Sequence, residues 1–127
     1  MERVDTILTG GTVVTMNAEF DLIPDGAVAI RDNQIAAVGT SANIAARYEA
    51  DTVVSCAGQY ILPGLVNAHT HVPMTLLRGL ADDRRLDVWL MGYMMPTERE
   101  FVNPEFCRVG TGLACAEMIR GGVTCFA

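Results

Sequence analysis

The most informative segment of the chain reads Ile61-Leu62-Pro63-Gly64-Leu65-Val66-Asn67-Ala68-His69-Thr70-His71. Pro63-Gly64 is typical of a turn, and the apolar residues after it predict a short β-strand that ends at two histidines. His69 and His71 are the only histidines of the chain. Side chains two residues apart on a strand project from one face, about 6.5–7 Å apart at Cα. Both imidazoles can therefore bind one cation at the ~2.0–2.1 Å of a Zn–N bond.

Two histidines alone do not complete a catalytic zinc site, which usually has three protein ligands and a water molecule. Asp82 and Asp83 lie beside Arg84-Arg85 in a polar segment that is typical of a solvent-exposed loop. The missing ligands are therefore expected from chain beyond residue 127 or from another subunit. The alternative is a structural role, in which both rings hydrogen-bond to carbonyl groups near the end of the strand.

The residues toward the C-terminus predict a helix and a second strand. Asn103-Pro104-Glu105 combines a capping residue, a proline in the first turn and an acid at the positive end of the helix dipole. The apolar face of this helix is expected at Phe106, Val109, Leu113 and Ala116. Gly121-Gly122 ends the helix, and residues 123–127 begin a strand. Strand, helix and strand form a βαβ unit of a parallel sheet. Since two strands cannot complete such a sheet, we expect the front portion of a longer protein.

The first 60 residues predict a β-rich unit of short strands separated by turns. Three turns are expected, at Gly10-Gly11, Asp32-Asn33 and Ala57-Gly58, each between two neighbouring strands. A short helix is expected over residues 41–48, with a serine or threonine cap.

Composition and charge exclude several classes of protein. Of the 127 residues, 50% are hydrophobic and 19% are charged, which argues against a disordered chain. Fifteen acidic and nine basic residues give a net charge of −6, so nucleic acid and anionic membranes are not expected as partners. No apolar run reaches the ~18–20 residues of a membrane span, and the acidic first residues do not resemble an export signal. The four cysteines form no Cys-x-x-Cys pair, so free thiols and a cytoplasmic location are expected.

Two further stretches carry a family resemblance together with segment 61–71. They read Val72-Pro73-Met74-Thr75-Leu76-Leu77-Arg78-Gly79-Leu80-Ala81-Asp82-Asp83 and Met118-Ile119-Arg120-Gly121-Gly122-Val123-Thr124. The sequence resembles the amidohydrolase superfamily, in particular the branch of the 5-methylthioadenosine/S-adenosylhomocysteine deaminases and the triazine-type hydrolases. The resemblance implies an α/β fold. Residues 1–60 would be the N-terminal part of a β-sandwich, and residues 61–127 would be the first βα unit and second strand of a (β/α)8 barrel.

The same resemblance implies a metal and a reaction. One divalent metal, zinc with Fe²⁺ or Mn²⁺ as alternatives, would be held by His69, His71, a later histidine and a later aspartate. The catalytic residues that move protons are expected beyond residue 127. The implied reaction is hydrolytic deamination of an adenosine-like nucleoside (S-adenosylhomocysteine, 5-methylthioadenosine or adenosine) with release of ammonia. The alternatives are a triazine or other heteroaromatic deaminase or chlorohydrolase, and a non-catalytic amidohydrolase-like scaffold.

Two residues are candidates for contact with the substrate. Glu98 resembles the glutamate that adenosine-type deaminases of this branch place on the ribose hydroxyls, where a carboxylate accepts two hydrogen bonds from a vicinal diol. The alternative for Glu98 is a solvent-facing charge among charged neighbours. Trp89, the only tryptophan, is a candidate wall of the pocket, and burial among leucines is its alternative. The expected partner is a small-molecule substrate, and a homo-oligomer is left open.

Overall fold

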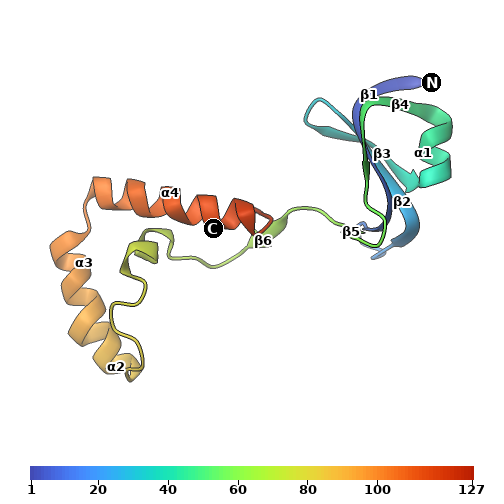
Figure 1. The fold of residues 1–127 in the computed structure, drawn as a ribbon. Helices are drawn as coiled ribbons and strands as arrows, with labels where there is room; N and C mark the ends of the chain where they lie inside the picture. The colour runs from blue at the N-terminus through green and yellow to red at the C-terminus, as the bar shows by residue number, and fades with distance from the viewer. The chain divides into compact units, whose positions relative to one another are not determined.

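The structure, a computed structural model, describes residues 1–127. Its contacts divide the chain into two units, Met1–Pro63 and Gly64–Ala127 (Figure 1), and each unit is described by itself. None of the helices has the length and apolar character that crossing a lipid bilayer requires.

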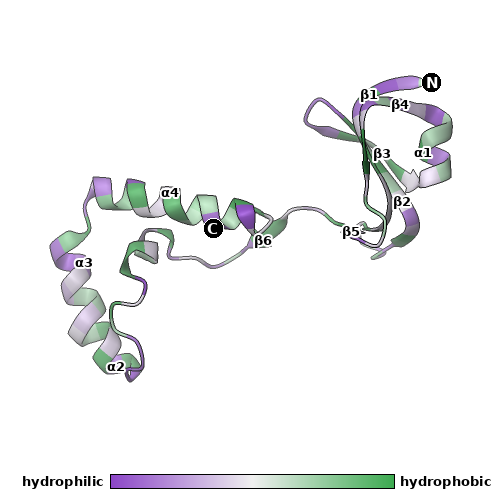
Figure 2. Cartoon of the chain, in the orientation of Figure 1, coloured by the Kyte–Doolittle hydropathy of each residue, from purple (hydrophilic) through white to green (hydrophobic).

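The first unit is built around a five-stranded sheet. Its elements are β1 (Glu2–Val14), β2 (Leu22–Arg31), β3 (Gln34–Thr40), α1 (Ser41–Arg47), β4 (Tyr48–Ser55) and β5 (Tyr60–Ile61). The strand order is β3-β2-β1-β4, and β5 also pairs with β1. Because β1 pairs antiparallel with β2 and parallel with β4 and β5, it is the central strand. The predicted hairpin between β2 and β3 is confirmed. It turns at Asp32-Asn33, with Asp32 at a φ of 54° and hydrophilic residues at the tip (Figure 2).

The core of the first unit lies between one face of this sheet and α1. It consists of the buried side chains Val4, Ile7, Ala27, Ala29, Ile44 and Tyr48. The predicted helix and its cap are confirmed, since the Thr40 hydroxyl accepts a hydrogen bond from the Asn43 backbone N–H at 3.3 Å. The small side chains of Ala27 and Ala29 leave room for Ile44, the buried residue of α1.

The opposite face of the sheet carries an aliphatic row that crosses all four long strands. Val38 pairs with Val28, Val28 pairs with Leu8, and Leu8 pairs with Val54. The two outer members are partly exposed, at 43% for Val38 and 42% for Val54. Val28, in the middle of the row, is only 6% exposed, and residues 61–63 line a cavity together with Leu8, Val28 and Val38. Within the first unit this face is therefore covered only in part.

One predicted turn and one predicted strand pair are wrong. Gly10-Gly11 lies inside β1, where Gly10 has a φ of +82° and the register to β2 shifts between Thr9 and Gly11. This is the pattern of a β-bulge with glycine in the left-handed region, which resembles a turn in sequence. The predicted turn at Ala57-Gly58 is confirmed, since the Gln59 N–H donates a hydrogen bond to the Cys56 carbonyl at 2.9 Å. The strands on either side of it, β4 and β5, do not pair with each other, because both pair with β1.

The second unit contains a parallel strand pair and several helices. Its elements are β6 (Leu65–Asn67), the 3-10 helix η1 (Val72–Leu77), α2 (Leu86–Val88), the π-helix η2 (Trp89–Met94), α3 (Met95–Phe101), α4 (Pro104–Arg120) and β7 (Val123–Phe126). β6 and β7 pair in parallel, so the predicted βαβ connection is confirmed. The start of α4 is also as predicted, since the Asn103 side chain accepts a hydrogen bond from the Phe106 N–H at 2.9 Å.

The face of α4 that packs within this unit differs from the predicted one. Gly110 and Ala114 are its buried residues, whereas Val109 and Leu113 are 42% and 43% exposed. The reason is a close approach of two backbones. A Cβ added to Gly110 would lie only 2.5–3.0 Å from backbone atoms of Pro73 in η1. The prediction relied on large apolar side chains at helical spacing. The contact face of α4 instead consists of small residues, so that pattern could not identify it.

Candidate metal centre and substrate cavity

The two candidate metal ligands follow β6, at the carboxyl end of the β6–β7 pair. β6 ends at Asn67, so His69 and His71 lie in the connection to η1. The expected alternation of strand side chains does not extend to them, because the strand is shorter than predicted. Gly64 directly precedes β6 and lies against Thr124, whose side chain leaves no room for a Cβ. This contact explains why glycine follows proline at this turn.

Hydrogen bonds tie the histidine segment to the end of β7. The Asn67 side-chain oxygen accepts a hydrogen bond from the His69 backbone N–H at 3.2 Å. The Asn67 carbonyl accepts one from the Ala127 N–H at 3.1 Å, and the Thr70 hydroxyl donates to the Ala127 carbonyl at 2.8 Å. The histidine segment is therefore fixed to Ala127 at the end of β7 through the Asn67 carbonyl and the Thr70 hydroxyl. The sequence analysis did not assign a role to Asn67 or Thr70. Their only indication in the sequence is that they are polar residues where an apolar run ends.

The histidine segment brings the two imidazole rings together. Their centroids lie 5.1 Å apart with the ring planes at 65°, and both residues are exposed. Two imidazoles that bind one zinc ion with tetrahedral geometry and Zn–N bonds of ~2.0–2.1 Å have centroids about 5 Å apart. The arrangement of His69 and His71 therefore fits a shared divalent metal. No group of three or more His, Cys, Asp or Glu side chains in the chain is arranged to hold a metal ion.

An ion pair holds the end of η1 against α4, in addition to the close approach at Gly110. Arg78 donates two hydrogen bonds to the Glu117 carboxylate, at 2.9 and 2.8 Å. The Arg78 guanidinium, through these hydrogen bonds, lowers the pKa of Glu117 below its ordinary value, and the carboxylate raises the pKa of Arg78. Both side chains are largely exposed, so the pair orients the segment after His71 more than it stabilises the fold.

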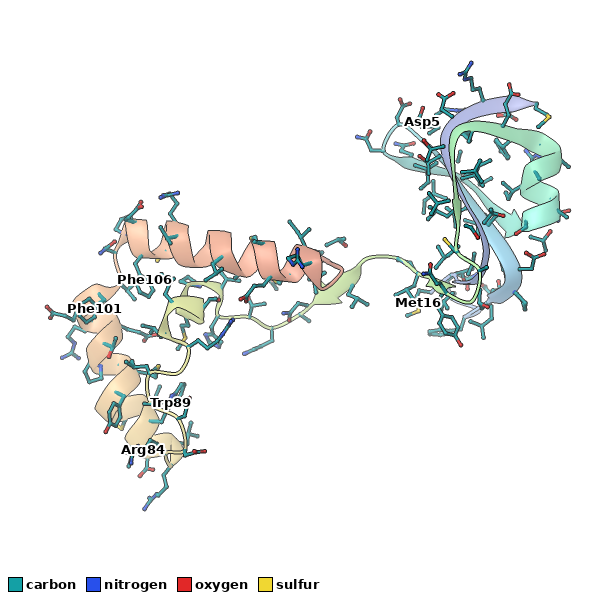
Figure 3. The ribbon with its side chains drawn as sticks, in the orientation of Figure 1. Asp5, Met16, Arg84, Trp89, Phe101 and Phe106 are labelled. Atoms are coloured by element: carbon teal, nitrogen blue, oxygen red, sulfur yellow. The ribbon has the colours of Figure 1, made fainter.

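An open cavity of about 370 Å³ lies beside His71. Its lining includes Arg78, Asp82, Trp89 and Met94. The Trp89 side chain lies between its helix and the preceding segment of chain (Figure 3). Trp89 and the candidate metal ligand His71 therefore line the same cavity. Glu98 is half-buried on α3 and is not among the residues that line this cavity.

Comparison with known sequences identifies relatives over nearly the whole chain. The profile of the amidohydrolase family matches residues 60–127, more than half of the chain, and the profile of an imidazolonepropionase-like composite domain of bacteria matches residues 26–48. A 5-methylthioadenosine/S-adenosylhomocysteine deaminase of Syntrophus aciditrophicus (strain SB) is 48% identical over 99% of this chain and 28% of its own length. A 5'-deoxyadenosine deaminase of Methanothermobacter thermautotrophicus is 41% identical, with the same coverage. The chain thus spans little more than a quarter of these relatives.

Solved structures are similar in fold over the same range. An adenosine deaminase from Xanthomonas campestris with bound zinc superposes with a TM-score of 0.90 at 45% identity, over 98% of this chain and 28% of that structure. An atrazine chlorohydrolase from Arthrobacter aurescens TC1 superposes with a TM-score of 0.77 at 21% identity, over 95% of this chain and 28% of that structure, which is a likeness of fold alone. These findings confirm the mixed α/β architecture and the family resemblance of the sequence. The chain belongs to the amidohydrolase family.

Proposed function

We propose that the protein to which this chain belongs is a metal-dependent hydrolytic deaminase of adenosine-like nucleosides. The proposed substrates are S-adenosylhomocysteine, 5-methylthioadenosine and adenosine, whose adenine becomes hypoxanthine as ammonia leaves. The observation that carries the proposal is the imidazole pair, 5.1 Å apart, directly after β6. Relatives that are named deaminases of such nucleosides, 48% and 41% identical, support the substrate class.

Each candidate residue has a distinct role in this proposal. His69 and His71 would hold the divalent metal, for which zinc is proposed with Fe²⁺ and Mn²⁺ as alternatives. Such a metal, when bound, supplies hydroxide near neutral pH by lowering the pKa of water. Trp89 forms a wall of the cavity beside His71 and excludes water from one side of the substrate. Glu98 accepts hydrogen bonds from the ribose hydroxyls, which fixes the orientation of the nucleoside.

The proposed architecture of the whole protein extends both units. Residues 61–127 begin a (β/α)8 barrel, a proposal supported by the parallel pairing of β6 and β7 on either side of α4. Residues 1–60 contribute one part of a β-sandwich, supported by the match of residues 26–48 to a composite domain. Active sites of such barrels lie at the carboxyl ends of the strands, where His69 and His71 stand. The remaining metal ligands and the groups that move protons are then contributed by other barrel strands.

Substrate turnover tests the proposed function. The full-length, zinc-loaded protein is incubated separately with S-adenosylhomocysteine, 5-methylthioadenosine, adenosine and an aminotriazine, and the released ammonia is measured. Turnover of the nucleosides, without turnover of the triazine, is expected. Turnover of the triazine alone would replace the proposal by a heteroaromatic hydrolase. Absence of ammonia from every substrate, together with elemental analysis that finds no zinc, iron or manganese in the protein as purified, would favour a non-catalytic scaffold.

Glu98→Gln is expected to weaken recognition of the ribose diol. A carboxylate accepts hydrogen bonds from both hydroxyls, whereas an amide presents one oxygen and an NH₂ donor. We expect kcat/KM for adenosine to fall about 10–100-fold, chiefly through KM, with little change for 2′,3′-dideoxyadenosine. Glu100→Gln, on the same helix and exposed, is the matched control. Equal losses on the two substrates would contradict the assignment of Glu98 to the ribose.

A further inference from the structure

Each residue from His69 to His71 is held by a hydrogen bond that involves no imidazole. The His69 N–H donates to the side-chain oxygen of Asn67 at 3.2 Å. The Thr70 hydroxyl donates to the Ala127 carbonyl at 2.8 Å. The His71 carbonyl accepts a backbone hydrogen bond of 2.9 Å from the first turn of η1. The histidine segment is thus held at three consecutive residues, and two of these hydrogen bonds depend on the side chains of Asn67 and Thr70.

Asn67 supports His69 through a turn that the asparagine side chain closes on its own backbone. An asparagine oxygen can replace a backbone carbonyl as the acceptor for the N–H two residues later. Here the hydrogen bond lies directly after β6, which ends at Asn67. The parallel strand fixes Asn67 itself, since its carbonyl accepts a hydrogen bond from the Ala127 N–H at 3.1 Å. The position of His69 relative to β6 and β7 therefore depends on the Asn67 side chain.

Thr70 connects the chain between the two histidines to the same strand end. Its half-buried side chain reaches the Ala127 carbonyl, while the Ala127 N–H is taken by the Asn67 carbonyl. The alternative role of the histidines was to hydrogen-bond to carbonyl groups near the end of the strand. Asn67 and Thr70 make those connections instead, which leaves both imidazoles available to a ligand.

The positions of the two imidazole rings depend on this backbone. Both histidines are exposed, so side-chain packing constrains the rings only weakly. Their centroids nevertheless lie 5.1 Å apart, close to the separation of about 5 Å that a shared zinc ion requires. A site binds more tightly when its ligands are already held near the bound geometry. Displacement of the backbone at either histidine would separate the rings.

We infer that Asn67 and Thr70 are positioning residues of the proposed metal centre. Asn67 determines the place of His69, and Thr70 determines the course of the chain between the two ligands. Neither side chain is itself a ligand, and each acts through the backbone of the histidines. The inference rests on the proposed metal-dependent function and deepens it by naming the side chains that preorganise its ligand pair.

Paired substitutions in the full-length protein test both residues. Asn67→Ala and Thr70→Val remove the hydrogen bond, whereas Asn67→Asp and Thr70→Ser keep an oxygen that can form it. Competition with a chelator measures the affinity for zinc. Asn67→Ala and Thr70→Val are each expected to weaken zinc binding about 10–100-fold, the usual cost of losing a group that supports a ligand. Asn67→Asp and Thr70→Ser are expected to bind zinc without such a loss.

Cobalt(II) in place of zinc reports the geometry of the ligands through its visible absorption, which depends on their number and arrangement. A mere loss of stability does not change the spectrum of those molecules that remain folded and loaded. We expect an altered spectrum in Asn67→Ala and Thr70→Val, and the spectrum of the unsubstituted protein in Asn67→Asp and Thr70→Ser. An unaltered spectrum in Asn67→Asp also shows that the new carboxylate has not become a ligand.

Asn103→Ala is the matched control for the loss of an asparagine side chain. The Asn103 oxygen also accepts a backbone hydrogen bond, from the Phe106 N–H at 2.9 Å, but at the start of α4. Asn103 lies about three helical turns before Ala114, which lines a cavity with Asn67 and His71. Its replacement is expected to lower the stability through the lost cap and to leave the zinc affinity unchanged. A loss of zinc affinity as large as that of Asn67→Ala would overturn the assignment of Asn67.

The outcomes separate the inference from the proposed function. Unchanged zinc affinity and cobalt spectrum in Asn67→Ala or in Thr70→Val overturn the assignment of that residue. Equal losses in the two variants of one residue overturn it as well, because the oxygen would then not matter. Where Asn67→Ala does not fold, Thr70→Val decides the inference, since it replaces a hydroxyl by a methyl group of similar size. An unsubstituted protein that binds no zinc, iron or manganese refutes the proposed metal-dependent function itself.

Discussion

Alanine in place of His69 or His71 is expected to abolish both metal binding and deamination. Each substitution removes one of the two imidazoles whose rings lie 5.1 Å apart. Loss of a residue that merely supports a metal ligand already costs about 10–100-fold in metal affinity, so loss of a ligand should exceed 100-fold. Elemental analysis of the purified full-length variants measures the bound metal, and ammonia release measures the activity.

Asp83→Asn is the matched control for the histidine variants. Asp83 follows Asp82, which lines the cavity, but Asp83 itself does not line it. Its φ of 57° is a conformation that asparagine adopts readily. The substitution therefore removes a charge without backbone strain and should leave the metal content unchanged. Stoichiometric metal in either histidine variant would contradict the assignment of that histidine as a ligand.

Gly110→Ala is expected to lower the free energy of unfolding by about 1–3 kcal/mol, the usual cost of overpacking. The added Cβ would lie 2.5 Å from the Pro73 carbonyl oxygen and 2.9 Å from its Cα. These are backbone atoms, so relief requires η1 to move as a unit away from α4. Because Pro73 is two residues after His71, weaker metal binding is expected as well. Denaturant titration measures the stability, and competition with a chelator measures the metal affinity.

Gly112→Ala on the same helix is the matched control. It shows the effect of replacing a helical glycine by alanine without the close contact that Gly110 makes with Pro73. No atom lies within 4 Å of a Cβ placed on Gly112. This substitution should raise the free energy of unfolding by about 0.5–1 kcal/mol, because alanine is the better helix former. Similar changes in stability and metal affinity for both variants would contradict a special role of the contact between Gly110 and Pro73.

The sequence predicted correctly the helix start and the hairpin turn whose conformation is determined by residues close together in the chain. The Asn103 cap acts through its own side chain, and Asp32 turns the β2–β3 hairpin through its left-handed φ. Gly10-Gly11 carried the same turn signal but forms a bulge within β1. The difference is made by distant strands, since β4 pairs with β1 up to Thr9 and β5 pairs from Thr12 onward.

The sequence indicated those candidate site residues whose type alone suggests a metal ligand. His69 and His71 stand out because the chain has no other histidine. The contact at Gly110 could not be predicted, because a glycine that admits a distant backbone leaves no periodic pattern. The π-helical turn could not be predicted either, since Pro96 normally marks the end of a helix. Ribose recognition by Glu98 stays a prediction.

The order of the elements along the chain has a consequence for synthesis. Every strand that pairs with β1 is complete at Ile61, before β6 begins at Leu65. Since ribosomes add about 5–20 residues per second and N-terminal domains fold first, the first unit can form its sheet while the histidine segment is still in the exit tunnel. In that interval the outer members of the aliphatic row, Val38 and Val54, are exposed on a nascent chain. Until other chain covers them, the exposed outer members of this row are open to contact with other apolar surfaces.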